Sequence, residues 1–126
     1  MRLYLDTNIW IDIIEKRPGW KAAAKLLLNI MVNGSIVVSD ILLWELRKFS
    51  GSQLTALFAP FRCERVTIDV SERQEALRIS RERGTSLADS SHAILARNHD
   101  CVLVTRDKGF SALSDIAKSY TPEELL

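Results

Sequence analysis

Hydrophobic residues along the chain follow two patterns that alternate from one end to the other. Short apolar runs are typical of buried strands, and apolar residues at every third or fourth position are typical of amphipathic helices. The run Cys101-Val102-Leu103-Val104, bounded by Asp100 and Thr105, has the composition of a central strand buried on both faces. The predicted strands cover residues 3–5, 36–39, 66–70, 101–104 and, as a short edge strand, 116–120.

Helical repeats occupy the segments between these strands. The most regular repeat places Trp20, Leu27 and Met31 on one face and predicts that they lie in the core. Further along the chain, Ser71 with Gln74 has the spacing of a capping box and predicts a helix start. The predicted helices cover residues 7–16, 20–31, 41–48, 54–61, 72–83 and 87–97.

The alternation of strands and helices predicts an α/β fold with right-handed crossovers and a parallel sheet covered on both faces. A length of 126 residues with 47% hydrophobic content is typical of one globular domain, expected here over residues 1–126. No apolar stretch approaches the roughly 20 residues of a membrane helix, and the N-terminus enters a strand without a leader. An intracellular protein is expected.

Four carboxylates stand where strand or loop residues give way to a helix: Asp6, Glu45, Asp89 and Asp107. Such positions gather on one rim of an α/β sheet. Two unit charges about 4 Å apart repel by roughly 4 kcal/mol at an effective dielectric near 20, so converging acids must take up protons or hold cations. Oxygen ligands favour hard ions such as Mg²⁺ or Mn²⁺, and no Cys/His spacing suits zinc. The pattern predicts an acidic metal site.

Each acid also has an ordinary structural interpretation. Asp6 could cap a helix, Glu45 could pair with a nearby basic residue, and Asp107 could form a turn. Asp89 lies three residues after Ser86 and could complete a capping box. The inference depends on the joint placement of all four acids, which coincidence explains less well than it explains any one of them.

Several residues beside the acids are candidates for supporting roles. His92 follows Asp89 by three residues, although a structural helix histidine is favoured over a ligand. Trp10 and Trp44 could stack bases, but their helical spacing favours core packing. The basic residues nearest the acids could contact substrate phosphates or be solvated surface charges: Arg106, Lys108, Arg47 and Lys48.

Charge and cysteine content add two further constraints. The net charge is +1, but without the four candidate ligands twelve acids would remain against seventeen Lys and Arg. An acidic pocket on a mildly basic body suits a phosphate-bearing substrate. Cys63 and Cys101 fit no metal or redox motif and are expected to be buried reduced thiols.

Four short segments, in this order and spacing, resemble a PIN domain and, within that family, the VapC-type toxins of bacterial and archaeal toxin-antitoxin pairs. The resemblance spans nearly the whole chain. It implies a three-layer α/β/α fold with a parallel sheet ordered 3-2-1-4-5, and an endoribonuclease that leaves a 5′-phosphate and a 3′-hydroxyl. The segments are Leu5-Asp6-Thr7-Asn8, Trp44-Glu45-Leu46, Leu87-Ala88-Asp89-Ser90-Ser91-His92-Ala93 and Thr105-Arg106-Asp107-Lys108-Gly109-Phe110.

The resemblance also implies roles for individual residues. The four acids match the catalytic metal ligands, for Mg²⁺ or Mn²⁺, and Asn8 and Thr105 match polar positions that help to hold the site. Ser90, Ser91 and His92 depart from the commoner apolar pattern, which leaves open whether that helix adds substrate contacts. The implied partners are RNA, a small antitoxin protein and a second copy of the chain, in the cytoplasm.

Two rival functions are weaker. A phosphatase of the haloacid dehalogenase type also begins with a strand-end aspartate, but it needs a second aspartate two residues later, where this chain has Asn8. A catalytically inactive PIN-like module could bind RNA or a protein without cutting. The presence of all four acids argues against that alternative.

Overall fold

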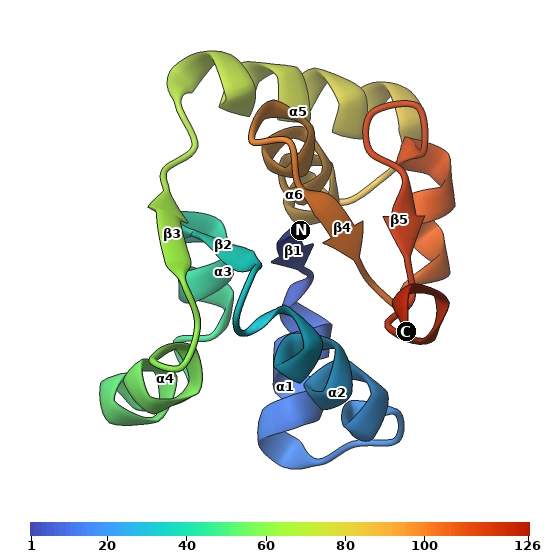
Figure 1. Cartoon of the computed structure of the whole chain (residues 1–126). Coiled ribbons are helices and arrows are strands. Elements are labelled where there is room, and N and C mark those ends of the chain that lie inside the picture. Colours follow the sequence, from blue (N-terminus) through green and yellow to red (C-terminus); the bar gives the residue numbers. More distant parts are fainter.

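The computed structural model describes residues 1–126 and places a five-stranded parallel sheet between two layers of helices (Figure 1). The strand order is β3-β2-β1-β4-β5, and every neighbouring pair is parallel. Both the three-layer α/β/α class and the sheet order implied by the resemblance are confirmed. The strands are β1 (Arg2–Leu5), β2 (Ser35–Ser39), β3 (Cys63–Val66), β4 (Val102–Val104) and β5 (Ser119–Tyr120).

Helices α1, α2 and α4 cover one face of the sheet, and α5 and α6 cover the other (Figure 1). Side chains alternate between the faces, so Leu3 and Leu5 of β1 pack in one core while Tyr4 between them packs in the second. None of the helices is long and apolar enough to cross a membrane. The helices are α1 (Thr7–Glu15), α2 (Trp20–Ile30), α3 (Asp40–Glu45), α4 (Gly51–Phe58), α5 (Val70–Arg83) and α6 (Leu87–Asn98), with 3₁₀ turns η1 (Lys108–Leu113) and η2 (Glu123–Leu125).

The segment from β3 to α5 differs from its prediction. β3 ends at Val66 instead of extending over residues 66–70, and its side chains are largely exposed because it is an edge strand. The helix cap is Asp69, which accepts from the backbone N–H of Glu72 at 2.7 Å, while the Glu72 carboxylate accepts from the Asp69 N–H at 3.0 Å. The capping box predicted at Ser71 and Gln74 is therefore wrong by two residues.

Other predicted positions differ as well, including α4, which covers Gly51–Phe58 instead of residues 54–61. α3 ends at Glu45 instead of Lys48, so this acid stands at a helix terminus facing the sheet rim. Trp20 and Met31 are only half-buried, although α2 itself is confirmed. Cys63 is exposed on the edge strand, contrary to the expected buried thiol, and Cys101 is half-buried.

Candidate active site

Asp6 is the most buried of the four acids, with 4% of its surface exposed. It directly follows β1, and its backbone N–H donates to the carbonyl of Val104 in β4 at 2.9 Å. The Thr105 hydroxyl donates to Asp6 Oδ2 at 2.9 Å. Burial raises the pKa of Asp6 above its usual range and nearby Asp89 adds to this, while His92 and Thr105 offset part of the rise. Asp6 is therefore held in place in an environment that disfavours its charged form.

Glu45, at the end of α3, is held by two donors on one oxygen. Its Oε1 accepts from the Thr7 hydroxyl at 2.8 Å and contacts Nε2 of His92 at 2.6 Å. Burial alone would raise the pKa of Glu45, but the hydrogen bonds and charge of these neighbours outweigh it, and the pKa lies below its usual value. Neither Arg47 nor Lys48 pairs with this carboxylate, and its basic neighbour is His92 instead.

Asp89 lies half-buried in the first turn of α6. The Ser86 hydroxyl accepts from the Asp89 backbone N–H at 3.0 Å, but the reciprocal bond of a capping box is absent. Burial raises the pKa of Asp89, and the charge of Asp107 raises it further. The helix cap thus uses the backbone N–H of Asp89, while hydrogen bonding to Ser86 offsets part of the rise in the pKa of the carboxyl.

Asp107 is exposed and forms the turn that starts η1. Its Oδ1 accepts from the backbone N–H of Gly109 at 2.8 Å, so the expected turn is present. Its own backbone N–H donates to the Thr105 hydroxyl at 3.0 Å, and that hydroxyl donates to Asp6. Thr105 therefore connects two of the acids, in agreement with the site-holding role that the resemblance implies.

The four acids form one electrostatic cluster drawn from four segments of the chain. Asp89 raises the pKa of Asp6, and Asp107 and Glu45 raise that of Asp89. No group of three or more His, Cys, Asp or Glu side chains is arranged to hold a metal ion in this conformation. Asp107 is exposed and Asp89 is only half-buried, however, and side chains with solvent access change rotamer readily, so both carboxylates can turn toward Asp6. The all-oxygen donor set and its mutual repulsion fit a hard divalent cation.

The residues that support the acids in the structure differ from those expected from the sequence. Asn8 is exposed and makes no side-chain hydrogen bond, whereas the adjacent Thr7 is buried and donates to Glu45. No sequence signal separates the two, because the exact start of α1 decides which side chain turns inward. Ser90 and Ser91 are buried, and each donates to a backbone carbonyl one helical turn earlier. They are not placed to contact substrate directly.

His92 is 1% exposed and lies inside the protein between two polar partners. Its Nδ1 contacts the Tyr4 hydroxyl at 2.6 Å, and its Nε2 contacts Glu45. The Tyr4 hydroxyl also contacts Ser39 Oγ at 2.6 Å. His92 is thus a buried helix histidine, as favoured from the sequence, but one in contact with a candidate ligand. Tyr4 and Ser39 were not identified from the sequence.

The candidate phosphate-binding residues differ in availability. Arg106 makes bonds of 2.8 and 2.6 Å to Glu123 and donates to the Gly19 carbonyl at 2.9 Å, so its guanidinium is already engaged. Arg47 is exposed and lies 3.6 Å from the centre of the Trp44 ring. Lys108 is exposed beside Asp107 and forms no ion pair, which leaves it the most available cation next to the acids.

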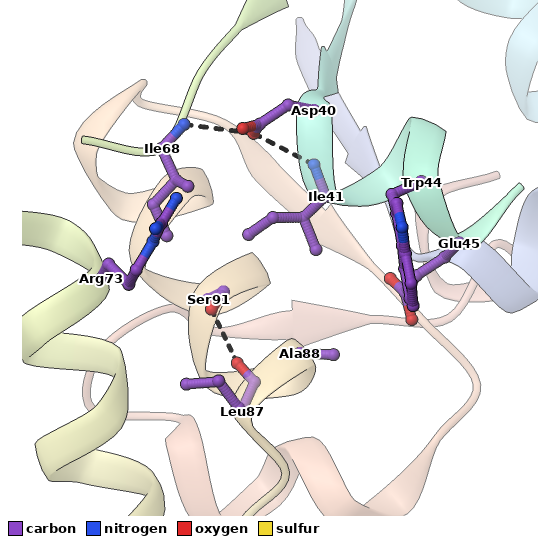
Figure 2. A pocket seen from close by; sticks show the side chains of 9 residues that line it. All are labelled: Asp40, Ile41, Trp44, Glu45, Ile68, Arg73, Leu87, Ala88 and Ser91. Carbon is purple, nitrogen blue, oxygen red and sulfur yellow. Dashed lines mark hydrogen bonds between the residues drawn. The ribbon is translucent and has the colours of Figure 1, made fainter. Parts of the chain in front are cut away.

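Glu45 borders an open cavity of about 610 Å³ between α3, α5 and α6. Figure 2 shows Glu45 and Trp44 on one wall, Ile68 and Arg73 opposite, and Leu87 on the floor. Trp44 is 64% exposed, so the predicted core packing of Trp44 is wrong, whereas Trp10 is fully buried as predicted. An exposed aromatic wall beside a candidate ligand is suited to contact with a partner or substrate.

Comparison with known proteins agrees with this geometry. A solved VapBC-1 structure from nontypeable Haemophilus influenzae is 23% identical, with a TM-score of 0.71 and coverage of 98% of this chain and 99% of that one. VapBC2 from Rickettsia felis, bound to a promoter DNA fragment, is 21% identical, with a TM-score of 0.71 and coverage of 96% and 98%. A toxin-antitoxin complex from Klebsiella pneumoniae is 24% identical, with a TM-score of 0.69 and coverage of 95% and 97%.

At these identities the solved structures establish the fold. No curated protein sequence matches the chain significantly. The family model described as PIN domain matches residues 3–116, which is most of the 126-residue chain. The chain therefore belongs to the PIN domain family.

Proposed function

We propose that this chain is a metal-dependent endoribonuclease that hydrolyses RNA phosphodiester bonds, with one PIN-like nuclease domain over residues 1–126. The observation that carries the proposal is the charge cluster centred on Asp6, in which burial and neighbouring carboxylates raise the pKa of Asp6 and Asp89 together. A divalent cation relieves such repulsion, whereas a structural role would be met more simply by neutral side chains.

The four acids Asp6, Glu45, Asp89 and Asp107 would hold Mg²⁺ or Mn²⁺. Such an ion supplies activation of water and neutralisation of charge on the scissile phosphate. Thr105 holds Asp6 in place, and Thr7 and His92 keep Glu45 ionised and oriented. Hydrolysis is proposed to leave a 5′-phosphate and a 3′-hydroxyl, as the resemblance to the family implies.

The substrate is proposed to be RNA because the residues around the acids are cationic. Lys108 stands beside Asp107, and Arg47 follows α3 on the surface. The body of the protein carries seventeen Lys and Arg against sixteen acids, of which four belong to the site. A phosphate backbone would meet favourable charge on the approach to the acidic rim.

We further propose a toxin role with an antitoxin partner and a homodimer. The similar solved structures include toxin-antitoxin complexes. This chain has apolar side chains at its surface that a protein partner would bury. Trp44 and Leu87 are large apolar residues exposed at the open cavity. Burying them against protein would remove an exposed apolar patch. The RNA substrate would place the enzyme in the cytoplasm.

The test is RNA cleavage by the purified chain with Mg²⁺ or Mn²⁺, in excess chelator, and with Asp6→Asn. Asp100→Asn is the matched control, because Asp100 precedes β4 at the opposite end of the strand and has a φ of 53° that asparagine also adopts. Cleavage that needs the ion and Asp6 but not Asp100 supports the enzyme. RNA binding without cleavage would support the inactive module instead.

A further inference from the structure

A chain of short hydrogen bonds crosses the protein interior and ends on Glu45. Ser39 Oγ accepts from the backbone N–H of Leu42 at 3.1 Å and contacts the Tyr4 hydroxyl at 2.6 Å. The Tyr4 hydroxyl contacts His92 Nδ1 at 2.6 Å, and His92 Nε2 contacts Glu45 Oε1 at 2.6 Å. The chain joins the two central strands β1 and β2 to α6 and then to the end of α3.

Burial makes this chain costly to leave unsatisfied. Tyr4 and Ser39 have no exposed surface and His92 has 1%. A polar group buried without a partner destabilises the folded state. The folded state therefore tolerates the side chains of Ser39, Tyr4 and His92 only if each forms hydrogen bonds, and all three do.

The contacts have one consistent direction. An ionised carboxylate can only accept, so His92 Nε2 donates to Glu45, and in the neutral imidazole Nδ1 then accepts from the Tyr4 hydroxyl. The Tyr4 oxygen then accepts from Ser39, whose oxygen accepts from the Leu42 backbone. Every donor points toward Glu45, an arrangement in which each bond polarises the next.

We propose that His92 is a positioning residue, which fixes the orientation of Glu45 so that its Oε2 faces the acidic site. This inference rests on the proposed function, since it assigns Glu45 as a ligand for the cation. Both donors, His92 and Thr7, contact Oε1, and neither contacts Oε2. Glu45 is half-buried and its Oε2 accepts no hydrogen bond, so this oxygen is free for a ligand, and the charge of Glu45 acts on Asp89, which places Glu45 near the other acids.

Two substitutions separate the two contacts of His92. His92→Gln places an amide N–H where Nε2 donates to Glu45, but it loses the acceptor for Tyr4. His92→Asn keeps an acceptor near Nδ1, but it falls short of Glu45. Each variant loses one buried hydrogen bond, so their unfolding temperatures in chelator should fall by similar amounts. This pair therefore isolates the Glu45 contact from general packing.

The measurement is Mn²⁺ affinity by isothermal titration calorimetry, with Mn²⁺ as the probe. Removing a group that orients a metal ligand weakens binding by about 10- to 100-fold, which is expected for His92→Asn, while His92→Gln retains most of the wild-type affinity. With RNA, His92→Asn should lower kcat more than it raises KM. Equal Mn²⁺ affinity in the two variants would overturn the positioning role.

Should both variants fail to fold, Tyr4→Phe provides the second test, because it removes only the hydroxyl and keeps the ring in place. The contact between His92 and Glu45 remains in this variant, so its Mn²⁺ affinity should stay near that of the wild type, as for His92→Gln, and a loss of about 10-fold or more would overturn the inference. The proposed function fails separately: a wild-type protein that binds Mn²⁺ through His92-oriented Glu45 but cuts no RNA leaves the inference standing. Absence of Mn²⁺ binding to the wild type overturns both.

Discussion

The two halves of the acidic site differ in how their carboxylates are held. In the Asp6–Glu45 half, both side chains accept hydrogen bonds from buried groups, Thr105 for Asp6 and Thr7 and His92 for Glu45. In the Asp89–Asp107 half, the carboxylates are half-buried and exposed, and they repel one another. The contrast indicates a rigid half that defines the site and an adaptable half that closes when a cation arrives.

The largest expected effect comes from the rigid half. Asp6→Asn should reduce RNA cleavage by about 100-fold or more, because it replaces the central carboxylate by a neutral amide, which is a weaker ligand for a divalent cation. Asp107→Asn, in the adaptable half, should reduce RNA cleavage by about 10-fold. Single-turnover cleavage rates, with Asp100→Asn as control, provide the comparison. Equal losses at the two positions would remove the distinction between the halves.

Removal of the Thr105 hydroxyl, which links the two halves, should have the next largest effect, on Mn²⁺ affinity. Thr105→Val keeps the shape of the side chain but removes the donor to Asp6 and the acceptor for the Asp107 N–H. We expect Mn²⁺ affinity to fall by about 10-fold. Thr121→Val is the matched control, since Thr121 lies in the C-terminal turn and bonds only to Glu124. A Thr105 variant with wild-type affinity would show that Asp6 holds its position without this bond.

Cation binding should stabilise the folded chain measurably. An ion present at 100 times its dissociation constant adds about 2.7 kcal/mol to the free energy of unfolding. Thermal unfolding with Mn²⁺ should therefore show a rise in Tm that Asp6→Asn abolishes. A rise of the same size in that variant would locate the ion elsewhere on the protein.

The smallest expected effect is on the pH dependence of the free energy of unfolding of the metal-free protein. The pKa of Asp89 is raised above its usual 3.8 by burial and by Asp107, so the folded state binds a proton more readily than the unfolded state. Asp89 should thus destabilise the protein at neutral pH, by less than about 1 kcal/mol given its partial exposure. Asp89→Asn should be the more stable protein at pH 7.

The stability gap between wild type and Asp89→Asn should narrow as the pH falls through the raised pKa toward 3.8, because both states of the wild type become protonated there. Urea unfolding at a series of pH values in chelator measures this gap. A gap that widens on acidification would mean that Asp89 is stabilised as an anion, contrary to the repulsion described for the adaptable half.

The sequence predicted the central part of the fold better than its edges. The apolar runs of β1, β2 and β4 are strong because these strands are buried between two helical layers. β3 lies at the edge with exposed side chains and carries no such run, which displaced both the predicted strand and the cap of α5. The sheet order came from the family resemblance, since local pattern does not specify which strands are neighbours.

The acids were recognisable for a similar reason, because each marks the end of an element. The groups that hold them were not, since Thr7, Tyr4 and Ser39 are ordinary helix and strand residues until the fold brings them beside Glu45 and His92. Trp44 was misassigned because α3 is too short to bury every apolar face, which leaves this ring at the surface.

The most direct test of the acidic site is a crystal of the chain grown with Mn²⁺ and examined by anomalous diffraction. The account predicts a strong anomalous peak bounded by Asp6 and Glu45, with Asp89 and Asp107 rotated toward it. An Mn²⁺-loaded crystal with these four carboxylates apart and no peak among them would contradict it.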